Sequence, residues 1–175
     1  MIDRRDFLPE SARRHALADA PLSIGHGQTN SQPTTVDNML ELLDARPGHR
    51  VLDVGSGSAW STARLAEIVG PSGRVFGVER VPELVEFGRT NLAKYDFPWA
   101  SIHQAGTTLG LPEEAPFDRI LVSAMAEKLP QDLVAQLAPE GVMVIPVAGR
   151  MLRVDAAGGA TAHGDYLFVP LITGE

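Results

Sequence analysis

The stretch from Arg50 to Arg80 constrains the fold of this 175-residue chain more than any other. An apolar run at residues 51–54 ends in the turn GSGSA, residues 55–59; a helical pattern follows, and a second apolar run at residues 75–78 stops at Glu79. This order predicts a strand, a tight turn, a helix and a second strand closed by a carboxylate. Such a unit cradles a nucleoside, because glycines let the backbone approach the ligand and the carboxylate accepts hydrogen bonds from ribose hydroxyls. A nucleoside-containing cofactor is therefore the leading hypothesis.

The glycine turn departs from two common nucleotide motifs. The third glycine of G-x-G-x-x-G is replaced by Trp60, and no Lys-Ser/Thr pair follows as in a phosphate-binding loop. What remains is D-x-G-x-G, beginning at Asp53. A carboxylate there repels a pyrophosphate but suits a cationic ligand, so the pattern favours S-adenosylmethionine, with its ammonium and sulfonium, over NAD. The alternative is that Asp53 only accepts N–H bonds from the turn, in a fold that binds nothing.

The composition excludes several function classes. A net charge of −7 without a basic run argues against a nucleic-acid partner. The chain has no cysteine, and its five histidines lack ligand spacing, so no metal is expected. No apolar run is long enough to span a membrane and the N-terminus does not resemble a signal peptide, so a cytoplasmic protein is expected. The oligomeric state is left open.

We expect one domain over residues 1–175, with residues 1–32 as an N-terminal loop or cap segment and residues 33–175 as the core. Apolar periodicity predicts a helix at residues 129–137, closed by the turn PEG at 139–141, and others at 33–43, 59–69 and 82–95. Strands are expected at residues 51–54, 75–79, 100–104, 117–122, 142–147, 151–154 and 166–171, with Gly158-Gly159 linking the last two in a hairpin. Alternating strands and helices that finish in a hairpin indicate a mostly parallel sheet with an antiparallel edge.

Several further stretches resemble the protein-L-isoaspartate O-methyltransferase family. Residues 21–33, PLSIGHGQTNSQP, are similar to its P-L-P-I-G-x-G-Q-T-I-S-x-P signature, and residues 4–9, RRDFLP, to its R-x-x-F-V-P. Residues 79–84 fit E-R-x-x-E-L, residues 115–124 resemble A-P-Y-D-x-I-x-V-T-A, and the ending FVPL at residues 168–171 also matches. The resemblance extends over nearly the whole chain, in order.

The resemblance implies a Rossmann-like class I S-adenosylmethionine-dependent methyltransferase fold, with a seven-stranded, mostly parallel sheet and a C-terminal antiparallel hairpin. It also implies a reaction, in which a carboxylate of an isoaspartyl residue in a peptide or protein takes the sulfonium methyl group. The resulting ester collapses to a succinimide, which starts repair. A carboxylate is ionised at neutral pH, so positioning rather than acid–base chemistry supplies most of the catalysis.

Carried over by position, Ser31 matches the catalytic serine; its plainer reading is an N-cap for the helix at Pro33. The resemblance assigns cofactor contacts to the loop over the cofactor (Gln28, Thr29), the methionine-binding turn (Asp53, Gly55, Gly57, Ser58, Ala59), the ribose carboxylate and its neighbour (Glu79, Arg80), the adenine loop (Gly106, Thr107) and the end of a strand (Val122, with Ser123). The plainer readings are an ordinary turn for Gln28 and Thr29 and a buried strand end for Val122. Core packing is the expected role of Trp60.

Four departures from the family pattern bear on function. Ala59 replaces a glycine, Gly106 replaces an aspartate that contacts adenine, and Thr34 replaces a histidine. The chain also starts late, without the extra N-terminal segment that family members usually have. We predict methylation of isoaspartyl residues. Two alternatives stay open: a methyltransferase for another acceptor, such as a specific peptide aspartate, or a degenerate relative that does not turn over.

Overall fold

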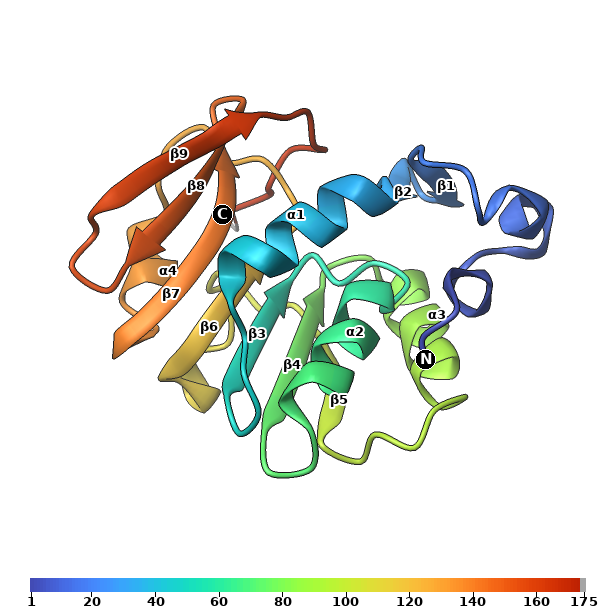
Figure 1. The fold of residues 1–175 in the computed structure, drawn as a ribbon, viewed down its shortest axis with the longest axis horizontal. Coiled ribbons are helices and arrows are strands. Elements are labelled where there is room, and N and C mark those ends of the chain that lie inside the picture. The colour runs from blue at the N-terminus through green and yellow to red at the C-terminus, as the bar shows by residue number, and fades with distance from the viewer. Residues whose placement is uncertain (174–175) are drawn as a thin grey trace.

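The computed structural model describes residues 1–173, and its centre is a seven-stranded sheet with the order β5-β4-β3-β6-β7-β8-β9 (Figure 1). The strands β3 to β7 pair in parallel, whereas β8 and β9 run antiparallel to their neighbours. The predicted mostly parallel sheet with a C-terminal antiparallel hairpin is therefore confirmed. The strand bounds are β3 Arg50–Val54, β4 Arg74–Glu79, β5 Ala100–Gln104, β6 Phe117–Val122, β7 Leu137–Val147, β8 Arg150–Asp155 and β9 Ala160–Asp165.

Apolar layers cover both faces of the sheet. Helices α1 (Pro33–Leu43), α2 (Trp60–Val69) and α3 (Pro82–Leu92) share one core with Val51 of β3, while α4 (Gln131–Val134) packs on the opposite face with Leu52 (Figure 1). Successive side chains of a strand point to opposite faces, so neighbours such as Val51 and Leu52 enter different cores. Burial on both faces explains why the central strands read as continuous apolar runs.

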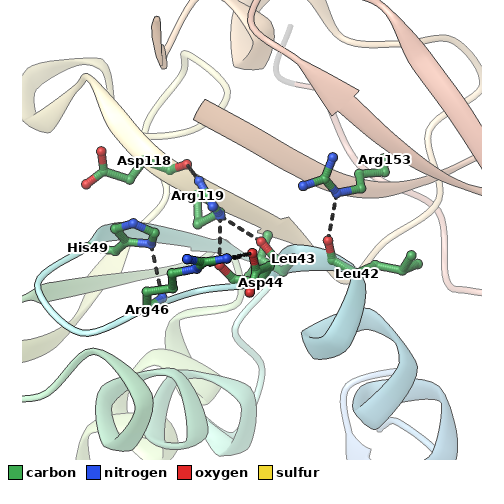
Figure 2. A network of polar contacts seen from close by, with 8 residues as sticks. All are labelled: Leu42, Leu43, Asp44, Arg46, His49, Asp118, Arg119 and Arg153. Atoms are coloured by element: carbon green, nitrogen blue, oxygen red, sulfur yellow. Dashed lines mark hydrogen bonds and ion pairs between the residues drawn. The ribbon is translucent and has the colours of Figure 1, made fainter. Parts of the chain in front are cut away.

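Helix α1 has the predicted bounds, and its C-terminus is held by two arginines from the sheet (Figure 2). Arg119 Nε of β6 donates to the carbonyls of Leu43 (2.7 Å) and Asp44 (3.2 Å), and Arg153 Nε of β8 donates to the carbonyl of Leu42 (2.9 Å). The last carbonyls of a helix have no partner within the helix, and cations are favourable beside them. This end of α1 is thereby fixed to the side of the sheet where β3 and β6 have their amino-terminal ends.

The C-terminal part differs from the prediction in two places. The last strand is not residues 166–171 but β9, which pairs with β8 and whose six residues are all exposed. Residues 166–171 instead form an extended tail held by Met125, which bonds Val169 and Leu171 through its backbone at 2.7 and 2.8 Å. The predicted helix at residues 129–137 shrinks to the four residues of α4, and β7 already begins at Leu137. Pro139 lies in β7 where the pairing with β6 is irregular, a place where a strand tolerates proline.

Residues 1–32, predicted as a loop or cap segment, hold regular structure. Two 3-10 helices, η1 (Arg4–Phe7) and η2 (Glu10–His15), precede a two-stranded hairpin of β1 (Leu22–Gly25) and β2 (Gln28–Asn30). The segment runs from the side of α3 to the start of α1 (Figure 1, dark blue). Elsewhere, α3 ends at Leu92, three residues before the predicted end, and a third 3-10 helix, η3, covers Pro112–Glu114. No helix within residues 1–173 combines the length and the apolar character needed to cross a membrane.

Candidate cofactor and acceptor site

A cavity of about 930 Å³ lies at the carboxyl ends of the central strands. Its floor is formed by the segments at the carboxyl ends of β3 (55–58), β4 (79–80), β5 (105–110) and β6 (123–124). The chain builds outward from β3 to β5 and then returns to place β6 on the other side of β3. Loops on the two sides of such a switch point diverge and leave a crevice, the usual ligand site of a parallel sheet.

The glycine turn after β3 is bonded to the neighbouring strand. Gly55 and Gly57 have φ values of 77° and 55°, which favour glycine. The backbone N–H groups of Gly55 and Ser56 both donate to the carbonyl of Val78 in β4, at 2.9 and 3.1 Å. The turn closes with a 2.8 Å bond from the N–H of Ala59 to the carbonyl of Ser56, and Ala59 itself takes a left-handed φ of 76°. The backbone therefore does require positive φ where the family has glycine and this chain has Ala59.

Helix α3 supports this turn from behind. A Cβ atom at Gly88 would lie 3.2 Å from the carbonyl oxygen of Gly57 and 3.4 Å from the Cβ of Ala59. Three residues later, the amide of Asn91 donates to the carbonyl of Ser58 at 3.1 Å and is buried. Neither residue was predicted from the sequence, although a glycine inside a helical pattern is a recognised signal of close packing.

Glu79 closes β4 and lies on the cavity wall with only 6% of its surface exposed. One carboxylate oxygen accepts the N–H of Gly57 at 3.2 Å, and the other accepts the N–H of Val81 at 2.7 Å. The neighbouring Arg80 also lines the cavity, and its carbonyl accepts the side-chain amide of Gln104 at 2.8 Å. Gln104, the last residue of the adjacent strand β5, is thus engaged outside the cavity wall.

Asp53 is fully buried beneath the turn and does not line the cavity. One carboxylate oxygen accepts the hydroxyls of Ser61 (2.7 Å) and Thr62 (2.8 Å) in the first turn of α2, and the other has no partner within residues 1–173. Burial raises the pKa of Asp53 to about 6, against the lowering effect of the two hydroxyls. Asp53 therefore joins β3 to α2 below the site.

The opposite wall carries Gln28, Thr29 and Ser31, at the point where β2 leads into α1. The N-cap reading of Ser31 is wrong, since Gln32 occupies that position and makes no side-chain capping bond. The first turn of α1 is capped from a distance instead.

The distant cap of α1 is Asp19. Its carboxylate accepts the backbone N–H of Thr34 at 2.9 Å and the Thr34 hydroxyl at 2.7 Å. These bonds hold the pKa of Asp19 below its usual value. Thr34 is the residue that replaces the family's histidine, and the sequence analysis did not foresee a partner for it 15 positions upstream.

The remaining cavity wall comes from the loop after β5 and from the C-terminal tail. An added Cβ at Gly106 would meet nothing within 4 Å, so the space beside this residue is open. On the other side of the sheet the N–H of Ser123 donates to the carbonyl of Val54 at 3.0 Å. The tail, including Phe168, completes the wall. No local pattern marked the tail as part of the site, because its place depends on the bonds to Met125.

The structure brings most of the predicted site residues to one cavity. Its lining includes Ser31, Gln28, Thr29, Gly55, Gly57, Ser58, Glu79, Arg80, Gly106 and Thr107. Asp53, Ala59 and Val122 lie outside the lining. Trp60 packs in the core as predicted, and it also lines the cavity.

The cavity residues fit a nucleoside-containing ligand. Glu79 and Arg80 are the charged residues among the described lining residues, and the fully buried carboxyl of Asp53 lies beneath the turn. The hydroxyl of Ser56 on the cavity wall is buried without a protein partner within residues 1–173. The volume lies within the range of small-molecule sites.

Solved structures share this architecture. A Plasmodium falciparum protein, described as a putative protein-L-isoaspartate O-methyltransferase in complex with S-adenosyl-L-homocysteine, superposes with a TM-score of 0.85 at 29% identity, covering 98% of this chain and 87% of that one. A second structure, described as a protein-L-isoaspartate O-methyltransferase, superposes with a TM-score of 0.87 and shares the fold at 22% identity, covering 98% of this chain and 59% of that one. With its sheet order and switch-point cavity, the chain has the fold of the class I S-adenosylmethionine-dependent methyltransferases.

Sequence relatives narrow that class to one family. Protein-L-isoaspartate O-methyltransferases from Methanopyrus kandleri and Aeropyrum pernix are 46% and 47% identical to this chain, covering 99% and 98% of it and 81% and 69% of the relatives. The family model for protein-L-isoaspartate(D-aspartate) O-methyltransferase matches residues 1–174. The chain belongs to this family, as the resemblance in the sequence indicated.

Proposed function

We propose that this protein transfers a methyl group from S-adenosylmethionine to a carboxylate of isoaspartyl residues in damaged peptides and proteins, as a repair enzyme. The observation that carries the proposal is that one cavity, in a member of this family, has the glycine turn and Glu79 on one wall and Ser31 on the opposite wall. The names of the relatives and the S-adenosylhomocysteine complex of the Plasmodium structure support the same activity.

Each part of the cavity has a distinct role in holding the cofactor. Glu79 accepts the ribose hydroxyls, because its carboxylate is fixed by two backbone bonds and keeps free lone pairs. The turn at residues 55–58 holds the amino-acid end, and the loop at residues 105–110 holds the base. The open space beside Gly106 is left where the family has an aspartate, so backbone groups and the hydroxyl of Thr107 take over polar contacts to the base.

The acceptor side needs position rather than proton transfer. When bound, S-adenosylmethionine supplies a methyl group activated by a positively charged sulfur. The carboxylate of the acceptor is already ionised at neutral pH, so no general base is required. A C–O bond forms as the C–S bond breaks, and both charges disappear as a neutral ester and a neutral thioether result. The hydroxyl of Ser31 holds the carboxylate by a hydrogen bond in line with this transfer.

The decisive assay compares two peptides of one sequence, one with an isoaspartyl and one with an ordinary aspartyl residue. We expect a methyl ester on the isoaspartyl peptide alone, detected by mass spectrometry. Ser31→Ala should remove about 1.5–3 kcal/mol of transition-state stabilisation, the value of a hydrogen bond to a charged group. The value of kcat/KM should fall accordingly. Ser72→Ala, in an exposed turn far from the cavity, is the matched control. Methylation of neither peptide by protein that binds S-adenosylhomocysteine would point to another acceptor.

A further inference from the structure

Arg4 is a charged residue that the proposed chemistry does not use, yet it is 94% buried, with 6% of its surface exposed. It lies in η1, and within residues 1–173 its guanidinium donates hydrogen bonds to one later segment of the chain, residues 16–31. Arg4 Nε donates to the side-chain oxygen of Asn30 at 2.7 Å. The other nitrogens donate to the carbonyls of Ala16 (3.2 Å), Ala18 (2.9 Å), Ala20 (2.8 Å), Asn30 (3.4 Å) and Ser31 (3.1 Å).

This arrangement is unusual for a buried cation. Burying a guanidinium is costly unless its donors are satisfied, and here the acceptors are carbonyl and amide oxygens rather than a carboxylate. The guanidinium also lies 5.3 Å from the ring centre of Trp60, the first residue of α2 after the glycine turn. One side chain thus gathers a segment of 16 residues against the helix that begins at the cofactor turn.

The gathered segment, residues 16–31, is here called the acceptor loop. It carries five cavity residues, Pro21 and those at positions 28–31. Asn30 continues the contact from Arg4 by donating to the hydroxyl of Ser58 over a long 3.5 Å bond. Asp19 of the same segment caps α1. We propose that Arg4 is a positioning residue that keeps the acceptor loop closed over the cavity and so sets the affinity for the peptide acceptor. This inference rests on the proposed function.

Loosening of the acceptor loop should affect KM and kcat differently. If the loop is closed only part of the time, the apparent affinity for the acceptor falls by the closed fraction, whereas a bound acceptor still meets the closed site. Loss of Arg4 should therefore raise KM for the peptide and leave kcat nearly unchanged. Cofactor affinity should change less than acceptor affinity, because Glu79 and the glycine turn are held by β4 and α3, although Gln28 and Thr29 lie on the acceptor loop.

The test compares Arg4→Met, which keeps the apolar stem, with Arg5→Met, an exposed neighbour in the same 3-10 helix. For Arg4→Met we expect KM for the isoaspartyl peptide to rise about tenfold or more, with kcat and the Kd of S-adenosylhomocysteine within about threefold of the wild type. Arg5→Met should match the wild type. Arg4→Lys, which keeps the charge but offers a single donor group, should be intermediate and serves if Arg4→Met does not fold. An unchanged KM in a folded Arg4 variant overturns the proposal.

A second readout does not depend on turnover. Backbone amides of residues 16–31 should exchange hydrogen roughly tenfold faster in Arg4→Met than in Arg5→Met, while those of α2 keep their rates. Faster exchange confined to this segment supports the proposal even if the wild type methylates no isoaspartyl peptide, in which case only the proposed function fails. Equal exchange in the two variants, or faster exchange throughout the molecule, overturns it.

Discussion

The backbone N–H of Gly57 donates to a carboxylate oxygen of Glu79 at 3.2 Å. The bond joins the glycine turn after β3 to the end of β4, and the second oxygen of the carboxylate is held by Val81. Both oxygens keep a free lone pair that can accept a hydroxyl. The carboxylate is thus oriented before a ligand arrives, and little side-chain entropy remains to be lost on binding.

Replacing Glu79 tests this orientation. Glu79→Ala should weaken S-adenosylhomocysteine binding by about 1.5–3 kcal/mol, or at least about tenfold in Kd, because a charged hydrogen-bond partner is lost. Isothermal titration calorimetry measures the effect, with Glu83→Ala on the exposed first turn of α3 as the control. Equal affinities of the two variants would contradict the ribose role.

Ala59 offers a stability prediction, since its φ of 76° is unfavourable for any residue with a Cβ. The left-handed conformation costs about 1–2 kcal/mol, and glycine loses about 0.5–1 kcal/mol more than alanine through chain entropy. Ala59→Gly should therefore raise the free energy of unfolding by about 0.5–1 kcal/mol in urea titrations. Ala63→Gly, inside α2, should lower it by about 1 kcal/mol or more. A less stable Ala59→Gly would show that the methyl group makes compensating contacts.

Asp53 predicts a pH dependence of stability. Its pKa is raised from 3.8 to about 6 by burial, so between these values the folded state holds a proton that the unfolded state has lost. The stabilisation from protonated Asp53 is complete below pH 3.8 and is lost as the pH rises through about 6. Asp53→Asn stays neutral and can still accept the bonds from Ser61 and Thr62. The free energy of unfolding of Asp53→Asn minus that of the wild type should increase by an amount on the order of 3 kcal/mol between pH 4 and pH 7. A difference that stays constant over this range would contradict the assignment.

The arginine anchor at the far end of α1 gives a prediction that separates stability from binding. Arg119→Met leaves the carbonyls of Leu43 and Asp44 without their donor, which should lower the free energy of unfolding by about 1–3 kcal/mol (Figure 2). The Kd of S-adenosylhomocysteine should not change, since the cavity lies at the other end of the helix. Chemical denaturation and calorimetry report the two quantities. Arg74→Met, at an exposed position of β4, should alter neither.

The sequence predicted those elements whose signals are local. Helix α1 and strands β5 and β6 have the predicted bounds, because apolar periodicity and flanking prolines or glycines mark them. Strand β9 was not predicted because its six residues are all exposed and include no large apolar side chain; its pairing with β8 makes it a strand. The N-terminal hairpin is likewise held by tertiary packing, with Ile24 so close that a Cβ at Gly57 would lie 3.3 Å from it.

In the candidate site, too, the parts with local sequence signals could be predicted and the parts held by tertiary contacts could not. The glycine turn and Glu79 could be read from one continuous stretch of sequence. The groups that support the site lie far apart in the sequence: Asp19 bonds Thr34, Gly88 packs on Gly57, and Arg4 bonds Ser31. No local sequence pattern predicts contacts at such separations. The family resemblance supplied the residues of the acceptor side, but not the contacts that hold them.

The anchors at the two ends of α1 have a consequence for the order of folding. An 11-residue helix is marginal in isolation, and the groups that cap α1 come from Asp19 before it and from Arg119 and Arg153 far after it. Until β6 and β8 have been synthesised and paired, α1 lacks the three bonds at its C-terminal end. We therefore expect a nascent chain on the ribosome to fix the end of α1 beside Ser31 through Asp19, whereas the far end of the helix waits until Arg119 and Arg153 have emerged.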